Sequence, residues 1–190
     1  MRAPGYTLVE LVVVLALLAI LATTALPLAW PVGDTRLDAA AREVANALRF
    51  ARGEAIRTGG YYGVDFSVDA SAGYRRVRVF RTDSASPPNP VYDVRNPLDK
   101  NLYDMQLVSG PGTAGVVLSS ATFYYSSGLL TTVVRDWAAF DPTGTPVYYP
   151  DTVNYSAYST APNVSAVTLS YQGQSRQVLL DPVSGRVTTP

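Results

Sequence analysis

The chain has 190 residues and a formal net charge of zero, and it contains neither histidine nor cysteine. A neutral chain has no overall field that would draw it to nucleic acid. The absence of histidine excludes Ser-His-Asp triads, and the absence of both residue types excludes the usual zinc sites. No acidic pair has a recognisable catalytic partner either, so we expect no enzyme, no metal and no cofactor.

One long apolar run occupies residues 6–33, and Glu10 is its only charge. About 22 uncharged residues follow at positions 11–32, and at roughly 1.5 Å per residue a helix of that length crosses a hydrocarbon core of about 30 Å. A carboxylate at membrane depth costs roughly 2.5 kcal/mol or more, so we expect Glu10 to have a function. Arg2, the single cation before the run, favours a cytoplasmic N-terminus.

Two other interpretations of the run remain open. A secretory signal peptide usually has an apolar region of about 7 to 15 residues and an A-x-A-like cleavage site, but residues 22–29 do not give that motif cleanly. A plain membrane anchor has a suitable length, yet it leaves the carboxylate of Glu10 without a partner in lipid. Pro27 either bends the helix, because it removes a backbone donor, or marks the end of the membrane segment together with Trp30.

The sequence GYTLVE at residues 5–10, followed by the apolar run, resembles the N-terminus of type IV prepilins and type II secretion pseudopilins. In that family a membrane peptidase cuts after the glycine and methylates the new N-terminus, which here places the cut between Gly5 and Tyr6. The resemblance implies that Glu10 meets the free amine of Tyr6 in a neighbouring subunit, because pairing offsets two desolvated charges. It also implies a helix kink at Pro27.

The same resemblance implies a domain organisation, partners and a location. Residues 1–5 are expected to be a leader peptide, residues 6–33 a transmembrane and assembly helix, and residues 34–190 a pilin-like globular domain. The expected partners are the prepilin peptidase, other pilin or pseudopilin subunits and an inner-membrane assembly platform. The chain is expected to cross the inner membrane once, with its C-terminal domain in the periplasm, before it enters a pilus or pseudopilus. Because cysteine is absent, that domain must fold without disulfides.

A second helical pattern follows the apolar run. Asp34 or Thr35 can cap its start, and the glycines at residues 59–60 can end it, so we expect a helix to about residue 58. Apolar residues recur at alternating spacings of four and three, which predicts an amphipathic helix with a narrow buried stripe. The stripe consists of Leu37, Ala41, Val44, Leu48, Ala51 and Ala55.

Beyond residue 60 the apolar period changes to two, which predicts half-buried strands separated by glycine and proline turns. We therefore predict an α+β, pilin-like fold, in which a long N-terminal membrane-spanning helix continues into a globular domain of mostly antiparallel β-sheet packed on the helix. The proline-rich residues 82–106 are expected to form an exposed loop. The expected strands are 61–66, 74–81, 115–118, 122–125, 133–140, 166–171, 177–180 and a short piece near Val187.

Two groups of charged residues suggest binding sites. Arginines exceed acids within residues 42–81, but such a run is usually a solvated face. Arg42, Arg49 and Arg52 lie off the stripe of the predicted helix and are expected to be solvated. In the 82–106 loop, Asp93, Asp99 and Asp104 could bind calcium, but their spacing matches no EF-hand, so solvated acids are expected. The arginines are Arg42, Arg49, Arg52, Arg57, Arg75, Arg76, Arg78 and Arg81.

Three further segments resemble the GspH/FimT group of minor pilins and pseudopilins. Residues 51–56, with the sequence ARGEAI, look like the group's helix, residues 140–144 resemble its Phe-x-x-x-Gly turn, and residues 185–187 resemble its terminal Gly-Arg-Val strand. The resemblance implies a structural subunit that initiates or caps a type IV pilus or a type II secretion pseudopilus.

The alternative is a DNA-binding minor pilin that acts in DNA uptake during natural transformation. Some members of the group are thought to bind DNA through a C-terminal Gly-Arg-x-Arg element. Residues 185–188 keep the first arginine, Arg186, and lose the second. Arg176 is expected on the adjacent strand and partly restores the positive charge, since affinity for phosphates rises with the number that a protein neutralises.

Overall fold

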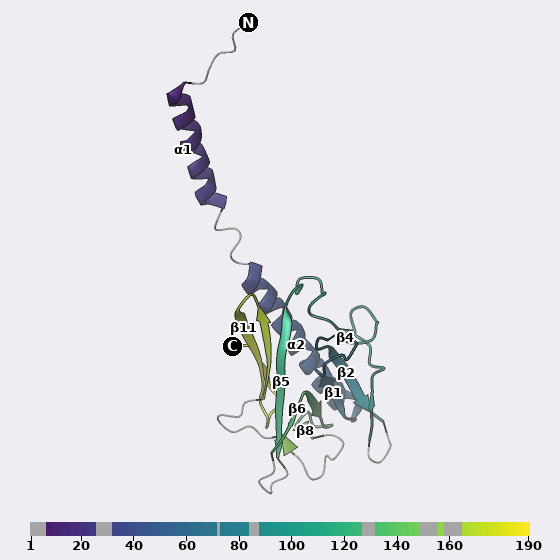
Figure 1. The fold of residues 1–190 in the computed structure, drawn as a ribbon. Helices are drawn as coiled ribbons and strands as arrows, with labels where there is room; N and C mark the ends of the chain where they lie inside the picture. Colours follow the sequence, from purple (N-terminus) through teal and green to yellow (C-terminus); the bar gives the residue numbers. More distant parts are fainter. Residues whose placement is uncertain are drawn as a thin grey trace.

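The computed structural model describes residues 7–25, 32–71, 73–83, 88–126, 132–148, 156–157 and 165–190. Two helices, α1 (Leu8–Ala25) and α2 (Val32–Thr58), precede the strands, and α1 stands apart from the rest of the protein (Figure 1). The strands are β1 (Tyr62–Asp65), β2 (Val77–Thr82), β3 (Pro90–Val91), β4 (Asp104–Met105), β5 (Val117–Ser126), β6 (Thr132–Arg135), β7 (Trp137–Phe140), β8 (Pro146–Val147), β9 (Ser156–Ala157), β10 (Ala166–Tyr171), β11 (Gln174–Leu180) and β12 (Val187–Thr188).

The first helix, α1, has exposed apolar side chains on every face. Leu8 is 79% exposed, and even Val13, deep within the helix, is 51% exposed. The hydroxyl of Thr7 accepts a hydrogen bond of 3.3 Å from the backbone N–H of Glu10, so Thr7 is the N-cap of the helix. Within the part of the chain that the structure describes, neither helix meets the combined length and apolarity needed to span a membrane.

The second helix, α2, ends at Thr58, close to the end predicted from the sequence. Gly59 closes it in the left-handed conformation, with φ of 68°, and its N–H donates to the carbonyl of Ala55 at 3.0 Å. The predicted start was wrong, because α2 begins at Val32 and places Asp34 and Thr35 inside the helix. In the first turn the negative charge of Asp34 still favours the helix, since it faces the positive end of the helix dipole.

The buried face of α2 is wider than the predicted stripe. All six stripe residues are buried, as predicted, and Ala40, Ala45 and Ala47 are fully buried as well. The reason is that α2 contacts strands from both halves of the sheet: β1, β2 and β7 in one half and β10, β11 and β12 in the other. Alanine lets the backbone of α2 approach these strands closely, and the sheet therefore covers more of the helix than one stripe.

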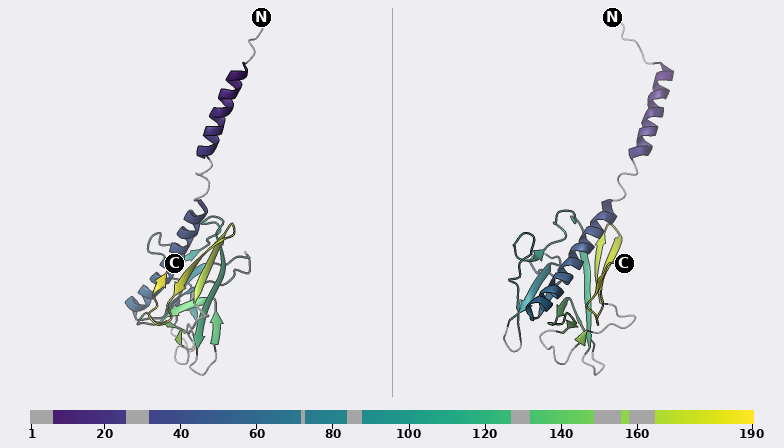
Figure 2. Two further views of the ribbon diagram at one scale, coloured as in Figure 1. Left: turned by 90° about the vertical axis from the view of Figure 1, so that its left-hand side faces the viewer. Right: turned by 180° about the vertical axis from the view of Figure 1, so that it is seen from behind.

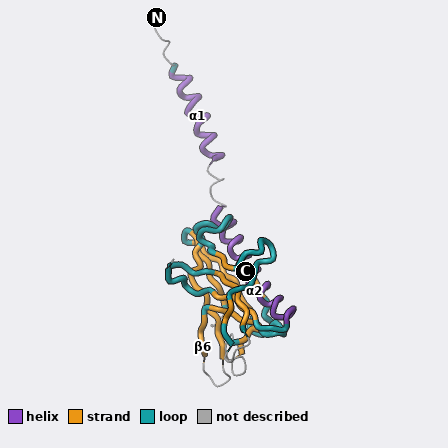
Figure 3. The backbone as a smooth tube through the Cα atoms, turned by 90° about the vertical axis from the view of Figure 1, so that its right-hand side faces the viewer, coloured by secondary structure: helices purple, strands orange, loops and turns teal. Residues whose placement is uncertain are grey.

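The strands form a single antiparallel sheet on one side of α2 (Figures 2 and 3). Their order is β12-β11-β10-β5-β9-β8-β7-β1-β2-β3, with β4 paired to β2 and β6 paired to β5. Each pairing between described strands is antiparallel. The predicted α+β fold, with an antiparallel sheet packed on a helix, is therefore confirmed.

Two strand predictions needed correction. The predicted strands at residues 115–118 and 122–125 are one strand, β5, which the serines between them do not interrupt. Ser119 instead lies where the register between β5 and β10 shifts, and its hydroxyl oxygen is 2.6 Å from that of Ser170 in β10. The predicted strand at 133–140 is divided at Asp136, because β6 pairs with β5 while β7 pairs with β1.

The prediction of an exposed loop for residues 82–106 was also wrong in part. β3 and β4 lie within this segment and both pair with β2, so the segment covers what would otherwise be an open sheet edge. Tyr103 is buried, its ring centroid lies 5.2 Å from that of Phe50 in α2, and burial raises the pKa of Tyr103 to about 12. The segment is thus attached to the helix as well as to the sheet.

We predict that residues from about 34 onward fold without the preceding segment. The buried side chains of α2 and of the strands form one continuous core, and a chain without cysteine needs no disulfide to complete it. A protein comprising residues 34–190 should give a cooperative urea transition by circular dichroism, at the same midpoint with and without a reducing agent. A chain that stays disordered until residues 6–33 are restored would contradict this domain boundary.

Candidate functional site

Glu10 lies in the first turn of α1 with its side chain exposed among apolar neighbours. It is the only charged residue among the described residues of α1. Exposed apolar surface costs roughly 25 cal/mol per Å² in water, so α1 gains free energy when lipid or other helices cover it. A helix buried in that way leaves the Glu10 carboxylate in need of a positive partner.

The other residues assigned to the N-terminal segment cannot be placed. Gly5, Tyr6 and Pro27 lie outside the described residues, so cleavage after Gly5, methylation of Tyr6 and a kink at Pro27 stay predictions. The capping contact of Thr7 nevertheless fixes where the helix begins, one residue after Thr7. It therefore places Glu10 in the first turn, next to the expected mature N-terminus.

Arg176 lies on β11 and Arg186 lies just before the neighbouring strand β12, and the two are not close together. Arg176 in β11 forms an ion pair of 2.8 Å with Asp38 of α2. Arg186 precedes β12, where its carbonyl accepts a hydrogen bond of 2.9 Å from the N–H of Asp181. Asp181 is five residues beyond Arg176, which corresponds to about 17 Å along a strand. The two cations therefore offer no joint phosphate site, and DNA contact stays a prediction that these positions do not strengthen.

The arginine-rich stretch is largely neutralised by aspartates and one glutamate. Five of its arginines form ion pairs of 2.6 to 3.2 Å with nearby carboxylates. These pairs leave little uncompensated positive charge along β2. The pairs are Arg57–Glu54, Arg75–Asp136, Arg76 with Asp69 and Asp104, Arg78–Asp65, and Arg81–Asp93.

The three aspartates considered for calcium have separate partners. Asp93 pairs with Arg81, whose hydrogen bond and charge lower the pKa of the Asp93 carboxyl, and Asp104 pairs with Arg76. Asp99 accepts hydrogen bonds from Asn101 instead. All three aspartates are exposed, as expected for solvated acids, although two of them also form ion pairs. Across the described ranges, no three potential metal ligands lie together.

The structure brings together three segments that are far apart in the chain. Arg52 of α2 donates from Nε to the carbonyl of Gly144 at 3.0 Å, and Arg49 donates to the carbonyl of Val187 at 3.1 Å. Arg42 and Arg49 are exposed, as expected, whereas Arg52 is only partly exposed, because its side chain reaches the carbonyl of Gly144. Gly185 lies against Gly144, since a Cβ atom built on Gly185 would be 2.5 Å from the Gly144 carbonyl oxygen.

We call the place where Arg52, Gly144 and Gly185 meet the junction. Each of the two turns at the junction is organised by an aspartate. The Asp141 carboxylate accepts from the N–H groups of Thr143 and Thr145, and the Asp181 carboxylate accepts from the N–H and hydroxyl of Ser184. The bonds from Ser184 lower the pKa of Asp181. Both turns share an Asp-Pro start and a later glycine in the sequence. That similarity was the available signal that the turns belong to one site.

Comparisons with known proteins show which families and structures the chain is similar to. Residues 1–26 match the prokaryotic N-terminal methylation motif, and residues 40–190 match the family of the type II transport protein GspH. The pilin-like protein PilA1 of Thermus thermophilus is 40% identical over 74 residues, which are 39% of this chain and 47% of that protein, so the match spans about half of its length. The type IV minor pilin FimU of Pseudomonas aeruginosa has a TM-score of 0.42 and 14% identity, covering 81% of this chain and 87% of that chain.

The family match includes all three segments that meet at the junction. Arg52, Gly144 and Gly185 lie within residues 40–190, and the methylation motif includes Glu10. The resemblance inferred from the sequence is thereby confirmed. The chain belongs to the family of the type II transport protein GspH, whose members are minor pilins and pseudopilins.

Proposed function

We propose that this protein is a structural subunit that initiates or caps a type IV pilus or a type II secretion pseudopilus. The observation that carries the proposal is α1, an apolar helix that is exposed on every face and carries a single acid near its start. Such a helix is suited to a shared bundle, because neighbouring helices can cover its apolar surface and provide a partner for Glu10.

Before assembly, we propose that the segment containing α1 lies in the inner membrane and that residues 34–190 face the periplasm. Arg2 on the cytoplasmic side supports this orientation, since cytoplasmic flanks tend to carry positive charge. During assembly the helix leaves lipid and joins the helices of neighbouring subunits at the assembly platform. The folded domain then needs no change of shape, because α2 rather than α1 holds the sheet.

Glu10 has a specific role in this proposal. In a dry bundle its carboxylate meets the methylated amine of Tyr6 in the neighbouring subunit, so two charges that would be costly alone are buried as a pair. The Thr7 cap supports this geometry, because it fixes the start of the helix next to the mature terminus.

Processing of the chain provides a direct test. The mature protein should lack residues 1–5 and begin with N-methylated Tyr6, because the methylation motif covers residues 1–26. Intact-mass measurement of membrane-extracted protein, followed by sequencing of its N-terminal peptide, detects both changes. A host without the prepilin peptidase is the control and should yield the uncut chain. A mature chain that starts beyond Ala22 would mean a secretory signal peptide, and the pilin function would fail.

A further inference from the structure

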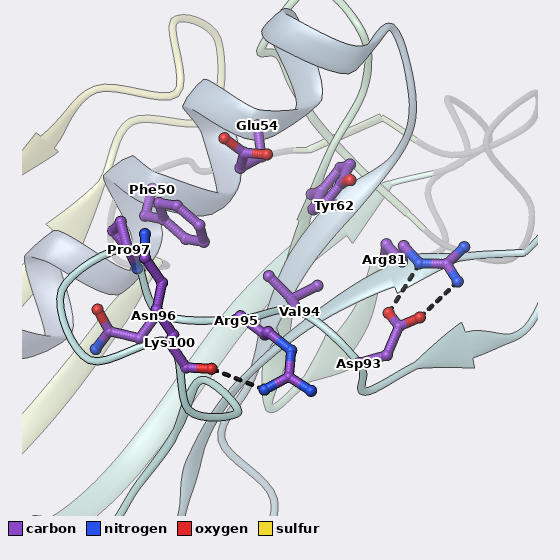
Figure 4. A pocket seen from close by; sticks show the side chains of 10 residues that line it. All are labelled: Phe50, Glu54, Tyr62, Arg81, Asp93, Val94, Arg95, Asn96, Pro97 and Lys100. Atoms are coloured by element: carbon purple, nitrogen blue, oxygen red, sulfur yellow. Dashed lines mark hydrogen bonds and ion pairs between the residues drawn. The ribbon is translucent and has the colours of Figure 1, made fainter.

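A pocket of about 400 Å³ lies between α2 and the segment at residues 93–100 (Figure 4). Its apolar wall comes from Phe50 of α2 and from Val94 and Pro97 of the segment. Arg95 and Lys100 line it on the segment side. This segment lies within residues 82–106, for which the sequence indicates no role.

The segment is held in one conformation by its own backbone. The N–H of Asn96 donates to the carbonyl of Asn101 at 2.9 Å, and the N–H of Lys100 donates back to Asn96 at 3.0 Å. The Arg95 guanidinium donates to the Lys100 carbonyl at 2.8 Å, as the dashed line in Figure 4 marks. Lys100 has a positive φ of 61°, which is uncommon for a residue with a side chain. These bonds hold the backbone that carries Leu98 and Lys100.

The charges around the pocket do not balance. Arg81 pairs with Asp93, which also lines the pocket, and Glu54 pairs with Arg57. Arg95 and Lys100 form no ion pair with any carboxylate of the described residues. The adjacent acid, Asp99, already accepts two hydrogen bonds from Asn101. Beside the apolar wall, Arg95 and Lys100 therefore have no ion-pair partner within the described part of the chain, and the carboxylate of Asp99 is held by Asn101 rather than by either cation. Most other arginines on this side of the domain have a carboxylate partner.

The same loop also presents an apolar side chain to solvent. Leu98 is 90% exposed and lies between the two unpaired cations in the chain. A single exposed leucine is common on protein surfaces. Here the leucine is held on a fixed turn, since the Leu98 N–H donates to the Asn96 side chain at 2.9 Å. A complementary partner surface would combine carboxylates, which pair with the two cations, with an apolar side chain, which packs against Leu98.

We propose that Arg95, Leu98 and Lys100 form a docking surface for an acidic segment of a neighbouring pilin-family subunit. The proposal rests on the proposed function, because the partner is present only if this chain assembles with other subunits. A carboxylate of that segment pairs with Lys100 or Arg95 at the pocket, while an apolar side chain beside it packs against Leu98, which lies outside the lining of the pocket. Pairing at such an exposed rim sets the orientation of the partner and weakens as salt screens the charges.

Lys100 makes this proposal testable because it is the only lysine in the chain. A water-soluble carbodiimide joins an amine to a carboxylate only where the two groups are in direct contact. In purified filaments it should link Lys100 to an aspartate or glutamate of another subunit, identified by mass spectrometry of the joined peptides. Arg95→Glu should lower the yield of this cross-link roughly fivefold, because an exposed ion pair is lost and replaced by repulsion between like charges.

Two variants distinguish the effect of the positive charge at position 100 from the chemical reactivity of the lysine amine. Lys100→Arg keeps the positive charge, so it should enter filaments normally while the cross-link disappears. Adding Gln177→Lys to that variant moves the only lysine to an exposed position on β11, and the same partner carboxylate should then remain unlinked. Normal incorporation with no cross-link, or with a link from Lys100 only to Glu54 of the same chain, would overturn the proposal. Absence of the chain from filaments would instead refute the proposed function itself.

Discussion

Gly185→Ala should lower the free energy of unfolding by about 3 kcal/mol. Gly185 has φ of 65°, a conformation that costs residues with a Cβ roughly 1–2 kcal/mol. The added methyl group would also lie 2.5 Å from the carbonyl oxygen of Gly144 and 3.0 Å from Nε of Arg52. Relief of that clash separates the two turns and breaks the bond from Arg52 to Gly144.

Two other glycines serve as controls in the same urea titration. Gly173→Ala places alanine at φ of 82° but with nothing within 4 Å, so it should cost only about 1 kcal/mol. Gly53→Ala lies inside α2 with open space around it and should stabilise the protein by roughly 0.5–1 kcal/mol. If Gly173→Ala and Gly185→Ala lower the free energy of unfolding equally, backbone conformation alone explains the effect and the junction adds no constraint.

Glu10→Leu should leave the amount of membrane-bound protein unchanged or raised while it lowers incorporation into filaments at least about tenfold. Leucine is favoured at membrane depth where a carboxylate is penalised, so insertion gains. Incorporation loses because the Tyr6 amine of a neighbour then remains buried without a counter-charge, and breaking a buried pair costs roughly 3–5 kcal/mol. Quantifying membrane and filament fractions separately reveals the opposite signs.

Matched substitutions in α1 distinguish charge from packing. Glu10→Gln keeps the size of the side chain and removes only its charge, so it should reduce incorporation nearly as much as Glu10→Leu. Val13→Leu changes the apolar surface of the same helix without touching a charge, and its incorporation should stay near normal. If α1 is only a membrane anchor, Glu10→Leu should raise membrane insertion without lowering incorporation into filaments. Wild-type incorporation of the Glu10→Leu protein would leave the assembly role of Glu10 without support.

Much of the architecture could be predicted because its signals are local in the chain. The stripe from Leu37 to Ala55 follows from the helical period, which depends only on residues three or four positions apart. The turn between β10 and β11 follows from Gln172 and Gly173, which adopt positive φ of 48° and 82°. The position of Glu10 behind a glycine and an aromatic residue is likewise a feature of one short segment. Such patterns can be recognised within a short stretch of the sequence.

The partners of the long polar side chains depended on the tertiary structure. Arg52 and Gly144 are 92 residues apart, and Arg49 and Val187 are 138 residues apart, yet each pair is joined by a hydrogen bond. An arginine off the apolar stripe is solvated or bound according to which turn the sheet brings beside it. Periodicity fixes which face of a helix is buried, but it contains no information about the register of distant strands. For this reason the helices and the fold class followed from the sequence, whereas the junction and the unpaired cations of the pocket were determined only by the packing of the sheet on α2.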